Sequence, residues 1–569
     1  MKVSKSAAKK KKEFYISNMK KNILYLTFLS AAITLFIAFR PVASNEFEVT
    51  KNFEIFKEIY TEIYSGYVDE HAPGDLMKRS IDGMLESLDP YTNYIPESDI
   101  EDYKIMTTGQ YGGVGALIRK MDDDFNYIME PYQDSPMQKA GFKAGDKILA
   151  IDGTDLKNKS TDEVSSMLKG SAGTSLKLKI ERAGQIIEKS LQREEIKIPD
   201  VPYSGILQDG IGYIKLNSFT QTASEEVKKA FKALKAQGMK KLIFDLRGNG
   251  GGLLNEAVSI VNIFVPQGTM IVKQKGRVPE MNINYLAREE ALDTEIPLVV
   301  LVDDGSASAS EIVSGSLQDL DRAVIVGTRS YGKGLVQQTR KMPYNTMVKL
   351  TVAKYYTPSG RCIQKLDYST KKAGDHASAI ADSVLQKFKT KNGREVMDGR
   401  GIEPEIKVEE KEFSRLAATV MAEDLVFHYS TKYARGHATI PTARQFKLTD
   451  NEYSEFLAEV KDKEFKYKTT TELRFEEFKK SAQRENYYSG AENEFDKIYA
   501  KIKADKMTDL SRFKDEIKEI IENEIVSRYY YQDGRMESSF NYDEFLTEAI
   551  KVMNDEGKFK AILAGPEKK

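Results

Sequence analysis

One serine and one lysine stand in short turns whose surroundings could make them reactive. Ser308 lies in residues 303–311, which follow an apolar predicted strand and open a predicted helix, so backbone N–H groups are free there. A serine needs a base to become a nucleophile. Lys333 stands between two glycines beside Leu335 and Val336. Burial there would lower its pKa from about 10.4 and yield a neutral amine able to take the serine proton.

Both residues also have ordinary structural interpretations. Ser308 and Glu311 match the capping-box pattern of a helix start, so the serine could serve only as an N-cap. Lys333 could be a loop charge in water. A Ser-His-Asp triad has little support, because no histidine lies in a comparable turn. The histidines are His71, His376, His428 and His437.

A glycine turn after another apolar strand could supply hydrogen-bond donors. Residues 244–254 hold four glycines in five positions and lead into a predicted helix. Such a turn can present backbone N–H groups to a phosphate or to the oxyanion of acyl transfer. A phosphate loop fits poorly, since the Walker spacing and its lysine are missing. Together, the three turns would provide nucleophile, base and oxyanion donors.

The elements around these turns alternate in the βαβ pattern. Strands are predicted at residues 211–216, 241–246, 297–303 and 323–327, with helices at 224–236, from about 255, and between the last two strands. This alternation predicts a largely parallel sheet, whose strands end at one common edge.

Other parts of the chain follow different patterns. Apolar residues at helical spacing predict two helices within residues 46–88, with a break at 71–74. Residues 111–182 read as short strands around glycine turns. Beyond about residue 410 the sequence predicts charged, aromatic-rich helices without a readable motif.

Composition narrows the function classes. The 569 residues carry a formal charge of -1, which gives no electrostatic reason to expect nucleic acid as partner. The single cysteine, Cys362, excludes an internal disulfide and a multi-cysteine metal site, and four scattered histidines disfavour a histidine cluster. We expect no cofactor and no metal.

The N-terminus resembles an export signal. Eight lysines within the first 21 residues precede an apolar run at residues 23–39. This combination predicts a signal peptide or a signal-anchor that leaves the lysines in the cytoplasm, and an uncleaved anchor is favoured. A buried core helix is the alternative, but polylysine rarely leads into a core.

Seven sequence blocks carry a family resemblance. They are residues 83–92, a PDZ-like stretch at 141–153, DLRGNGGG at 245–252, GSASASE at 305–311, GKGLVQ at 332–337, YTPSGRCIQ at 356–364 and GIEPE at 401–405. In this order they resemble the carboxy-terminal processing proteases, extracytoplasmic serine peptidases with a Ser-Lys dyad. Cys362 replaces a serine common in the family.

The resemblance implies roles for individual residues. Ser308 would be the nucleophile, Lys333 the general base, and Gln337 the group that orients the lysine. The backbone N–H groups of Ala309 and of Gly251 or Gly252 would form the oxyanion hole.

Two further roles follow from the resemblance. Glu311 would be the family's acid near the nucleophile. The PDZ domain would bind a C-terminal carboxylate through the loop Gly112, Gly113, Val114 and Gly115. A PDZ domain that only shields the site is the alternative.

The expected fold is α/β multidomain, with a crotonase-like βαβ protease core and an inserted PDZ domain. The expected parts are a signal segment (1–45), N-terminal helices (46–108), the PDZ domain (109–190), the peptidase core (191–410) and C-terminal helices (411–569).

The expected function is a serine endopeptidase on the periplasmic side of the inner membrane, held there by its N-terminal segment. It would process proteins with accessible C-termini, and its C-terminal helices could bind an adaptor or mediate self-association. The alternatives are a catalytically silent PDZ scaffold and a crotonase-type enzyme that binds acyl-CoA.

Overall fold

The computed structural model describes residues 45–369, 371, 376–409, 411–461, 463, 467–503 and 506–566. The chain divides into two compact units, residues 1–83 and 84–569. The predicted signal segment lies outside the described residues, apart from its last position. Within the described part of the chain, no helix is long and apolar enough to cross a membrane.

Two helices open the described chain, as their apolar spacing predicts. α2 (Asn45–Gly66) and α3 (Pro73–Glu86) are separated by the predicted break. α3 begins at a proline, whose missing N–H and restricted φ suit the first helical position. α4 (Ile100–Thr108) ends at Gly109, which has a φ of 68° and turns the chain into the next sheet.

Residues 116–192 form an antiparallel sheet, which agrees with the predicted short strands. Its order is β3-β4-β5-β7-β8, with β6 paired to β5, and β3 is an end strand. The elements are β3 (Ala116–Lys120), β4 (Asn126–Pro131), α5 (Pro136–Lys139), β5 (Lys147–Ile151), β6 (Thr154–Asp155), α6 (Thr161–Leu168), β7 (Ser175–Arg182) and β8 (Gln185–Gln192). β2 (Gln110–Gly113) pairs with β9 (Glu194–Lys197) where the chain enters and leaves this sheet.

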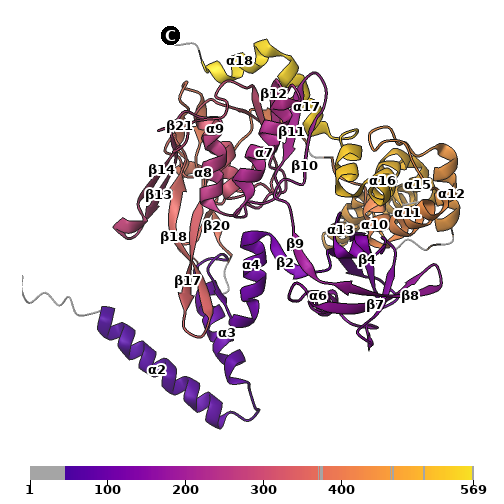
Figure 1. Cartoon of the computed structure of the whole chain (residues 1–569), viewed down its shortest axis with the longest axis horizontal. Helices are drawn as coiled ribbons and strands as arrows, with labels where there is room; N and C mark the ends of the chain where they lie inside the picture. The colour runs from indigo at the N-terminus through magenta and orange to yellow at the C-terminus, as the bar shows by residue number, and fades with distance from the viewer. Residues whose placement is uncertain are drawn as a thin grey trace, which may run out of the picture. The chain divides into compact units, whose positions relative to one another are not determined.

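A second six-stranded sheet contains the predicted βαβ units. Its order is β10-β11-β12-β15-β16-β23, and all neighbours from β11 onward are parallel. Its elements are β10 (Tyr203–Ile206), β11 (Ile211–Lys215), α7 (Ala223–Ala236), β12 (Lys241–Asp245), α8 (Leu254–Asn262), β15 (Leu298–Val302), α9 (Ala309–Asp319), β16 (Val324–Gly327) and β23 (Ile406–Lys407). Every residue of β15 and β16 is buried, because helices cover both faces of the sheet. We call it the core sheet (Figure 1).

A third sheet is antiparallel and was not predicted. It runs β1-β18-β13-β14, with β17 paired to β18. Its strands are β1 (Asn93–Ile95), β13 (Met270–Gly276), β14 (Ile283–Leu286), β17 (Leu335–Met342) and β18 (Thr346–Tyr356). Two small hairpins follow, β19 (Leu366–Asp367) with β20 (Ser378–Ala379) and β21 (Lys387–Lys389) with β22 (Glu395–Met397).

The predicted C-terminal helices are present, and the last of them belong to the core. α7, α8 and α9 cover one face of the core sheet, and α17 packs against the other. Phe545, Leu546 and Val552 of α17 share an apolar cluster with Ile243 and Val299 of the sheet. The helices are α10 (Arg415–Ala422), α11 (Leu425–Gly436), α12 (Asp450–Val460), α13 (Thr470–Arg484), α14 (Glu492–Ile502), α15 (Lys506–Arg512), α16 (Lys514–Ser539), α17 (Glu544–Asn554) and α18 (Glu556–Ala564).

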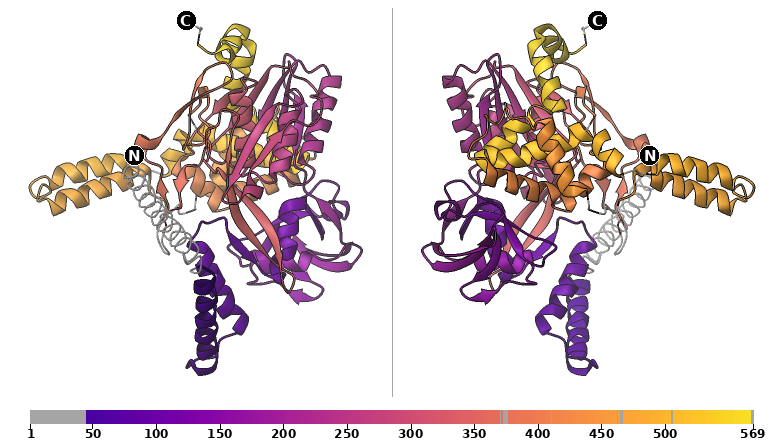
Figure 2. Two further views of the ribbon diagram at one scale, coloured as in Figure 1. Left: turned by 90° about the vertical axis from the view of Figure 1, so that its left-hand side faces the viewer. Right: turned by 90° about the vertical axis from the view of Figure 1, so that its right-hand side faces the viewer.

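The preceding C-terminal helices have cores of their own. α10, α11, α12 and α16 share one apolar cluster. α13 and α14 pack on each other through Phe475 and Phe495, and Figure 2 shows them extending as an orange pair from the other helices. α16 is interrupted at Tyr531, whose φ is 53°. The fold is therefore mixed α/β with several domains, as predicted.

The contact between α17 and the core sheet predicts a stability effect. Leu546 is 3% exposed, so Leu546→Ala should lower the free energy of unfolding by about 2–5 kcal/mol. Urea denaturation measures the change. Lys551 lies on the same helix with a side chain that is 64% exposed. Lys551→Ala should change stability by less than about 0.5 kcal/mol, and equal effects of the two variants would contradict the packing.

Candidate active site

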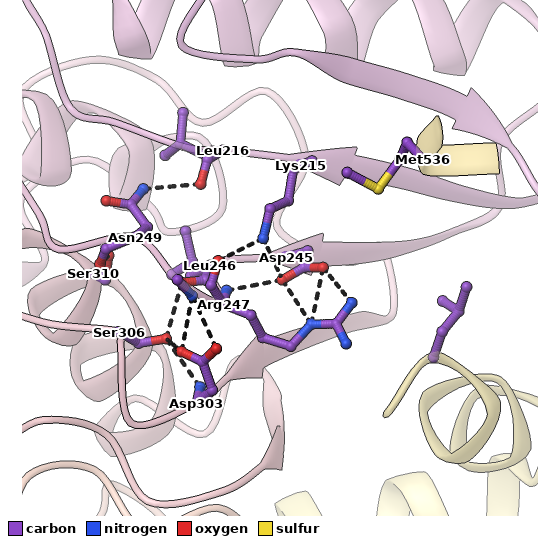
Figure 3. Close-up of polar contacts among 12 residues, drawn as sticks. Lys215, Leu216, Asp245, Leu246, Arg247, Asn249, Asp303, Ser306, Ser310 and Met536 are labelled. Atoms are coloured by element: carbon purple, nitrogen blue, oxygen red, sulfur yellow. Dashed lines mark hydrogen bonds and ion pairs between the residues drawn. The ribbon is translucent and has the colours of Figure 1, made fainter. Parts of the chain in front are cut away.

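Ser308 is the N-cap residue of α9, just past the carboxyl end of β15. Its φ of 55° and ψ of -109° are unusual for a residue other than glycine, and strained backbone of this kind clusters at functional sites. The neighbouring serines are fully buried, and the hydroxyl of each donates a hydrogen bond to a backbone carbonyl. Ser306 Oγ donates to the Leu246 carbonyl at 2.9 Å (Figure 3). Ser310 Oγ donates to the Asn249 carbonyl at 2.8 Å.

The Glu311 carboxylate joins the serine turn to the lysine turn. Its Oε2 accepts the N–H of Ser308 and that of Lys333, both at 2.8 Å. Its Oε1 accepts the N–H of Gly332 at 2.7 Å and the Ser330 hydroxyl at 2.5 Å. Burial raises the pKa of Glu311, and these four hydrogen bonds oppose the rise. The capping contact predicted for Glu311 is therefore present, and the same carboxylate holds the lysine loop.

Tyr355 adds a second connection between the two turns. Its buried hydroxyl lies 2.8 Å from the carbonyl oxygen of Lys333 and 3.1 Å from that of Ser308. Burial raises the pKa of this phenol, so it stays protonated and can donate. Sequence reasoning missed Tyr355, although it directly precedes the YTPSGRCIQ block.

Lys333 lies in a setting that increases the neutral fraction of its amine above that of a lysine in water. Burial, together with the charge of Lys349, lowers the pKa of Lys333 to about 8, while Glu311 and Asp89 oppose the shift. Its Nζ lies 4.2 Å from the ring centroid of Tyr91. The side chain is therefore not a loop charge in open water, which was the alternative interpretation.

A cavity of about 300 Å³ brings the predicted residues together. We call it the site cavity. The predicted residues that line it are Gly251, Gly252, Ser308, Ala309, Lys333 and Gln337. Lys349 and Tyr355, which were not predicted, line it as well.

The glycine turn lies directly against the turn that carries Ser308. A Cβ on Gly251 would lie 2.8 Å from the Ala307 carbonyl oxygen, and one on Gly252 would lie 2.4 Å from that of Phe219. The N–H of Gly251 donates to Asn249 Oδ1 at 2.9 Å. Among the described residues, the N–H groups of Gly252 and Ala309 have no acceptor.

Gln337 lies on β17, and its side chain lines the site cavity. Its Nε2 donates to Thr351 Oγ1 at 3.2 Å, on the neighbouring strand β18. In the described part of the chain, no hydrogen bond joins Gln337 to Lys333. The role predicted for Gln337 therefore stays a prediction.

Of the predicted carboxylate loop, only Val114 and Gly115 lie between β2 and β3. Gly115 has a φ of 72°, and a Cβ there would lie 2.5 Å from the Ser135 Cβ. The carbonyl of Val114 accepts the N–H of Met137 at 2.9 Å. Within the described residues, the N–H groups of Val114 and Gly115 have no acceptor. Gly112 and Gly113 belong to β2, which pairs with β9.

Three family models match parts of the chain. Residues 210–370 match peptidase family S41, and residues 127–182 match a PDZ domain. Residues 416–553 match a model described as the C-terminal helical domain of a probable PDZ-protease. The first match contains the strands β11 to β16 of the core sheet, the second contains β5 to β7 and most of β4, and the third contains most of the C-terminal helices.

Three known proteins are similar to this chain over more than half of its length. A carboxy-terminal-processing protease of Bartonella bacilliformis is 36% identical over 343 residues, which are 59% of this chain and 78% of that protein. A probable CtpA-like serine protease of Staphylococcus aureus is 34% identical over 315 residues, 55% of this chain and 62% of that protein. The solved photosystem II D1 C-terminal processing protease is 26% identical, with a TM-score of 0.34, over 62% of this chain and 92% of its own.

The like charge near Lys333 predicts a pH effect. Lys333 must be neutral to act in its predicted role as base, so that role predicts a rate that rises with pH through about 8. Lys349→Met removes a positive charge that lowers the Lys333 pKa, so the rising limb of kcat/KM should move to higher pH by up to about one unit. Lys349→Arg keeps the charge and should leave the limb in place. A limb that moves equally in both variants would contradict this origin of the pKa.

Proposed function

The chain belongs to the carboxy-terminal processing proteases of peptidase family S41, and from that premise we propose that it cleaves peptide bonds with a Ser308–Lys333 dyad. Family membership makes it a serine peptidase with a PDZ domain. The observation that carries the dyad is the pair of turns held on Glu311. They present Ser308 and a lysine of lowered pKa to one cavity.

The first half of the reaction uses three groups. Neutral Lys333 takes the Ser308 proton while Oγ attacks the peptide carbonyl carbon. The N–H groups of Gly252 and Ala309, which have no other acceptor among the described residues, donate to the oxyanion. The lysinium then gives its proton to the leaving amine. An acyl-enzyme on Ser308 remains.

Water completes the reaction. Lys333, neutral again, takes a proton from a water molecule that attacks the acyl carbon, and the proton returns to Ser308 as the ester bond breaks. Gln337 belongs to this part of the proposal as a residue that orients the lysine. The inactive-scaffold alternative has less support, because Ser308, Lys333 and Gln337 are all present and line one cavity.

A crotonase-like core also belongs to the proposal. It is supported by the parallel order β11-β12-β15-β16 and by the glycine turn that follows β12. An acyl-CoA enzyme is disfavoured, since the PDZ domain is suited to a peptide and not to a thioester.

Substrate tails would bind to the PDZ domain. β3 is an end strand, so a peptide can add to its open edge. The carboxylate would accept the N–H groups of Val114 and Gly115 at the start of that strand. Proteins with accessible C-termini are therefore the proposed substrates.

The periplasmic side of the inner membrane is the proposed location. The lysine-rich start and the apolar run at residues 23–39 support it, as signal peptide or anchor. Binding of an adaptor, or self-association, through the C-terminal helices stays a prediction. The pair α13–α14 offers exposed Phe478 and Tyr487 for such contacts.

The dyad is tested by cleavage of an unfolded protein with an apolar C-terminus, followed by mass spectrometry of the products. Ser308→Ala should lower kcat by about 10⁴-fold or more, and Lys333→Arg similarly, because arginine stays protonated. Lys341 is an exposed lysine of β17, so Lys341→Met serves as the control and should cleave normally. Cleavage that persists in Ser308→Ala would contradict the proposal.

Carboxylate recognition is tested with two peptides that differ only at the C-terminus. Replacing the free carboxylate by an amide should raise KM about tenfold or more, because charge-assisted hydrogen bonds are lost. The internal cleavage site is the same in both peptides, so kcat should stay similar. Equal KM values would favour a PDZ domain that only shields the site.

A further inference from the structure

Four charged side chains gather at the carboxyl end of β12, beside the glycine turn. Asp245 Oδ2 lies 2.6 Å from Arg247 Nη2, and its Oδ1 lies 3.2 Å from Lys215 Nζ (Figure 3). Arg247 also makes a two-point contact with Asp543, at 2.9 Å from Nη1 and 2.7 Å from Nη2. We call these four residues the charge cluster. Three come from the core sheet and its turn, and the fourth comes from the C-terminal helices.

The charge cluster is buried and balanced. The exposed fraction is 1% for the Asp245 side chain and 11% for that of Asp543. Burial alone would raise the pKa of Asp245, but the charges of Arg247 and Lys215 hold it well below its usual range. Two cations face two anions. Without Asp543, two cations would share a single buried anion, and a buried charge without its partner is strongly unfavourable.

The same cluster holds the backbone from which the glycine turn starts. The N–H of Arg247 donates to Asp245 Oδ1 at 2.8 Å, and Lys215 Nζ donates to the Arg247 carbonyl at 2.5 Å. The peptide groups on both sides of Arg247 are therefore oriented by members of the cluster. Gly252, the proposed oxyanion donor, lies five residues further along the chain.

The position of Asp543 is fixed, so its contact with Arg247 is fixed as well. It is the N-cap residue of α17, where its Oδ1 accepts the N–H of Leu546 at 2.9 Å. Two residues after Asp543, in α17, the ring centroid of Phe545 lies 5.1 Å from the Arg247 guanidinium carbon. α17 itself is packed on the core sheet. The Arg247 side chain is thus held by a charge and by an aromatic ring from one packed helix.

We propose that Asp543 is a positioning residue of the peptidase site, which acts through Arg247 on the glycine turn that carries the oxyanion donor. The C-terminal helices therefore complete the catalytic centre. This inference rests on the proposed function, because the orientation of the turn affects the rate only if Gly252 donates to an oxyanion.

Asp543→Asn tests the inference in the full-length protein. Asparagine keeps the helix cap but removes the charge. Loss of a whole oxyanion donor lowers kcat by about 10²–10³-fold, so displacement of the turn should lower kcat per active site by about 10–100-fold. KM should change less than about twofold. A peptide boronate, which forms a tetrahedral adduct on Ser308, should bind more weakly by the same factor as kcat/KM falls.

Active sites are counted by stoichiometric reaction with a fluorophosphonate. This count separates positioning from stability, because a merely structural role would reduce the number of reactive sites and leave kcat per site unchanged. Asp543→Glu keeps the charge and should recover most of kcat per site. Asp555 provides a matched control, since it is the exposed N-cap of the next helix and contacts no arginine within the described residues. Asp555→Asn should have normal kcat.

Each outcome has one meaning. Wild-type protein without Ser308-dependent cleavage would overturn the proposed function, and the inference with it. An active wild type whose Asp543→Asn variant has unchanged kcat per counted site would overturn the inference alone. If Asp543→Asn does not fold, Asp543→Ser, which also caps without charge, gives the same comparison. Lower kcat per site, unchanged KM and weaker boronate binding together would support the inference.

Discussion

The separation of the proposed nucleophile and base depends on one buried carboxylate. Glu311 forms no ion pair among the described residues, so hydrogen bonds alone must offset the loss of its hydration. Those bonds come from Ser308 on one side and from Ser330, Gly332 and Lys333 on the other. The two turns therefore cannot move apart without leaving a buried charge unsatisfied.

Other turns near the site are also held by a carboxylate that accepts backbone N–H groups. Asp303 accepts the N–H of Gly248 with both oxygens, and Asp89 accepts the N–H of Thr92 and its hydroxyl. Asp200 accepts the N–H and hydroxyl of Thr220. Carboxylates are strong acceptors of backbone donors, so each orients a loop that has no strand partner of its own. The site is thus assembled from turns that hydrogen bonds to carboxylates make rigid.

The elements that could be predicted from the sequence are those whose pattern lies within a short stretch of residues. The strands of the core sheet are apolar runs bounded by glycine turns, and their helices have clear periodicity, so both could be predicted. The third sheet, which contains β13 and β18, was missed because these two strands pair across about 80 residues of sequence and lack such boundaries. No sequence motif marks Lys349. Its effect on the pKa of Lys333 arises because both side chains line the same cavity, which only the fold brings about. The position of α17 could not be read either, because an amphipathic helix does not specify which surface it covers.

The packing of α17 on the core sheet also sets the order in which the molecule can be completed. A chain is made from its N-terminus at about 5–20 residues per second, so α17 appears roughly 10–40 seconds after β16. Until then, Ile243, Val299 and Leu301 have no helix over them, and this face of the sheet stays open to chaperones and to aggregation. A nascent chain therefore carries all its predicted catalytic residues long before α17 can cover this face of the core sheet.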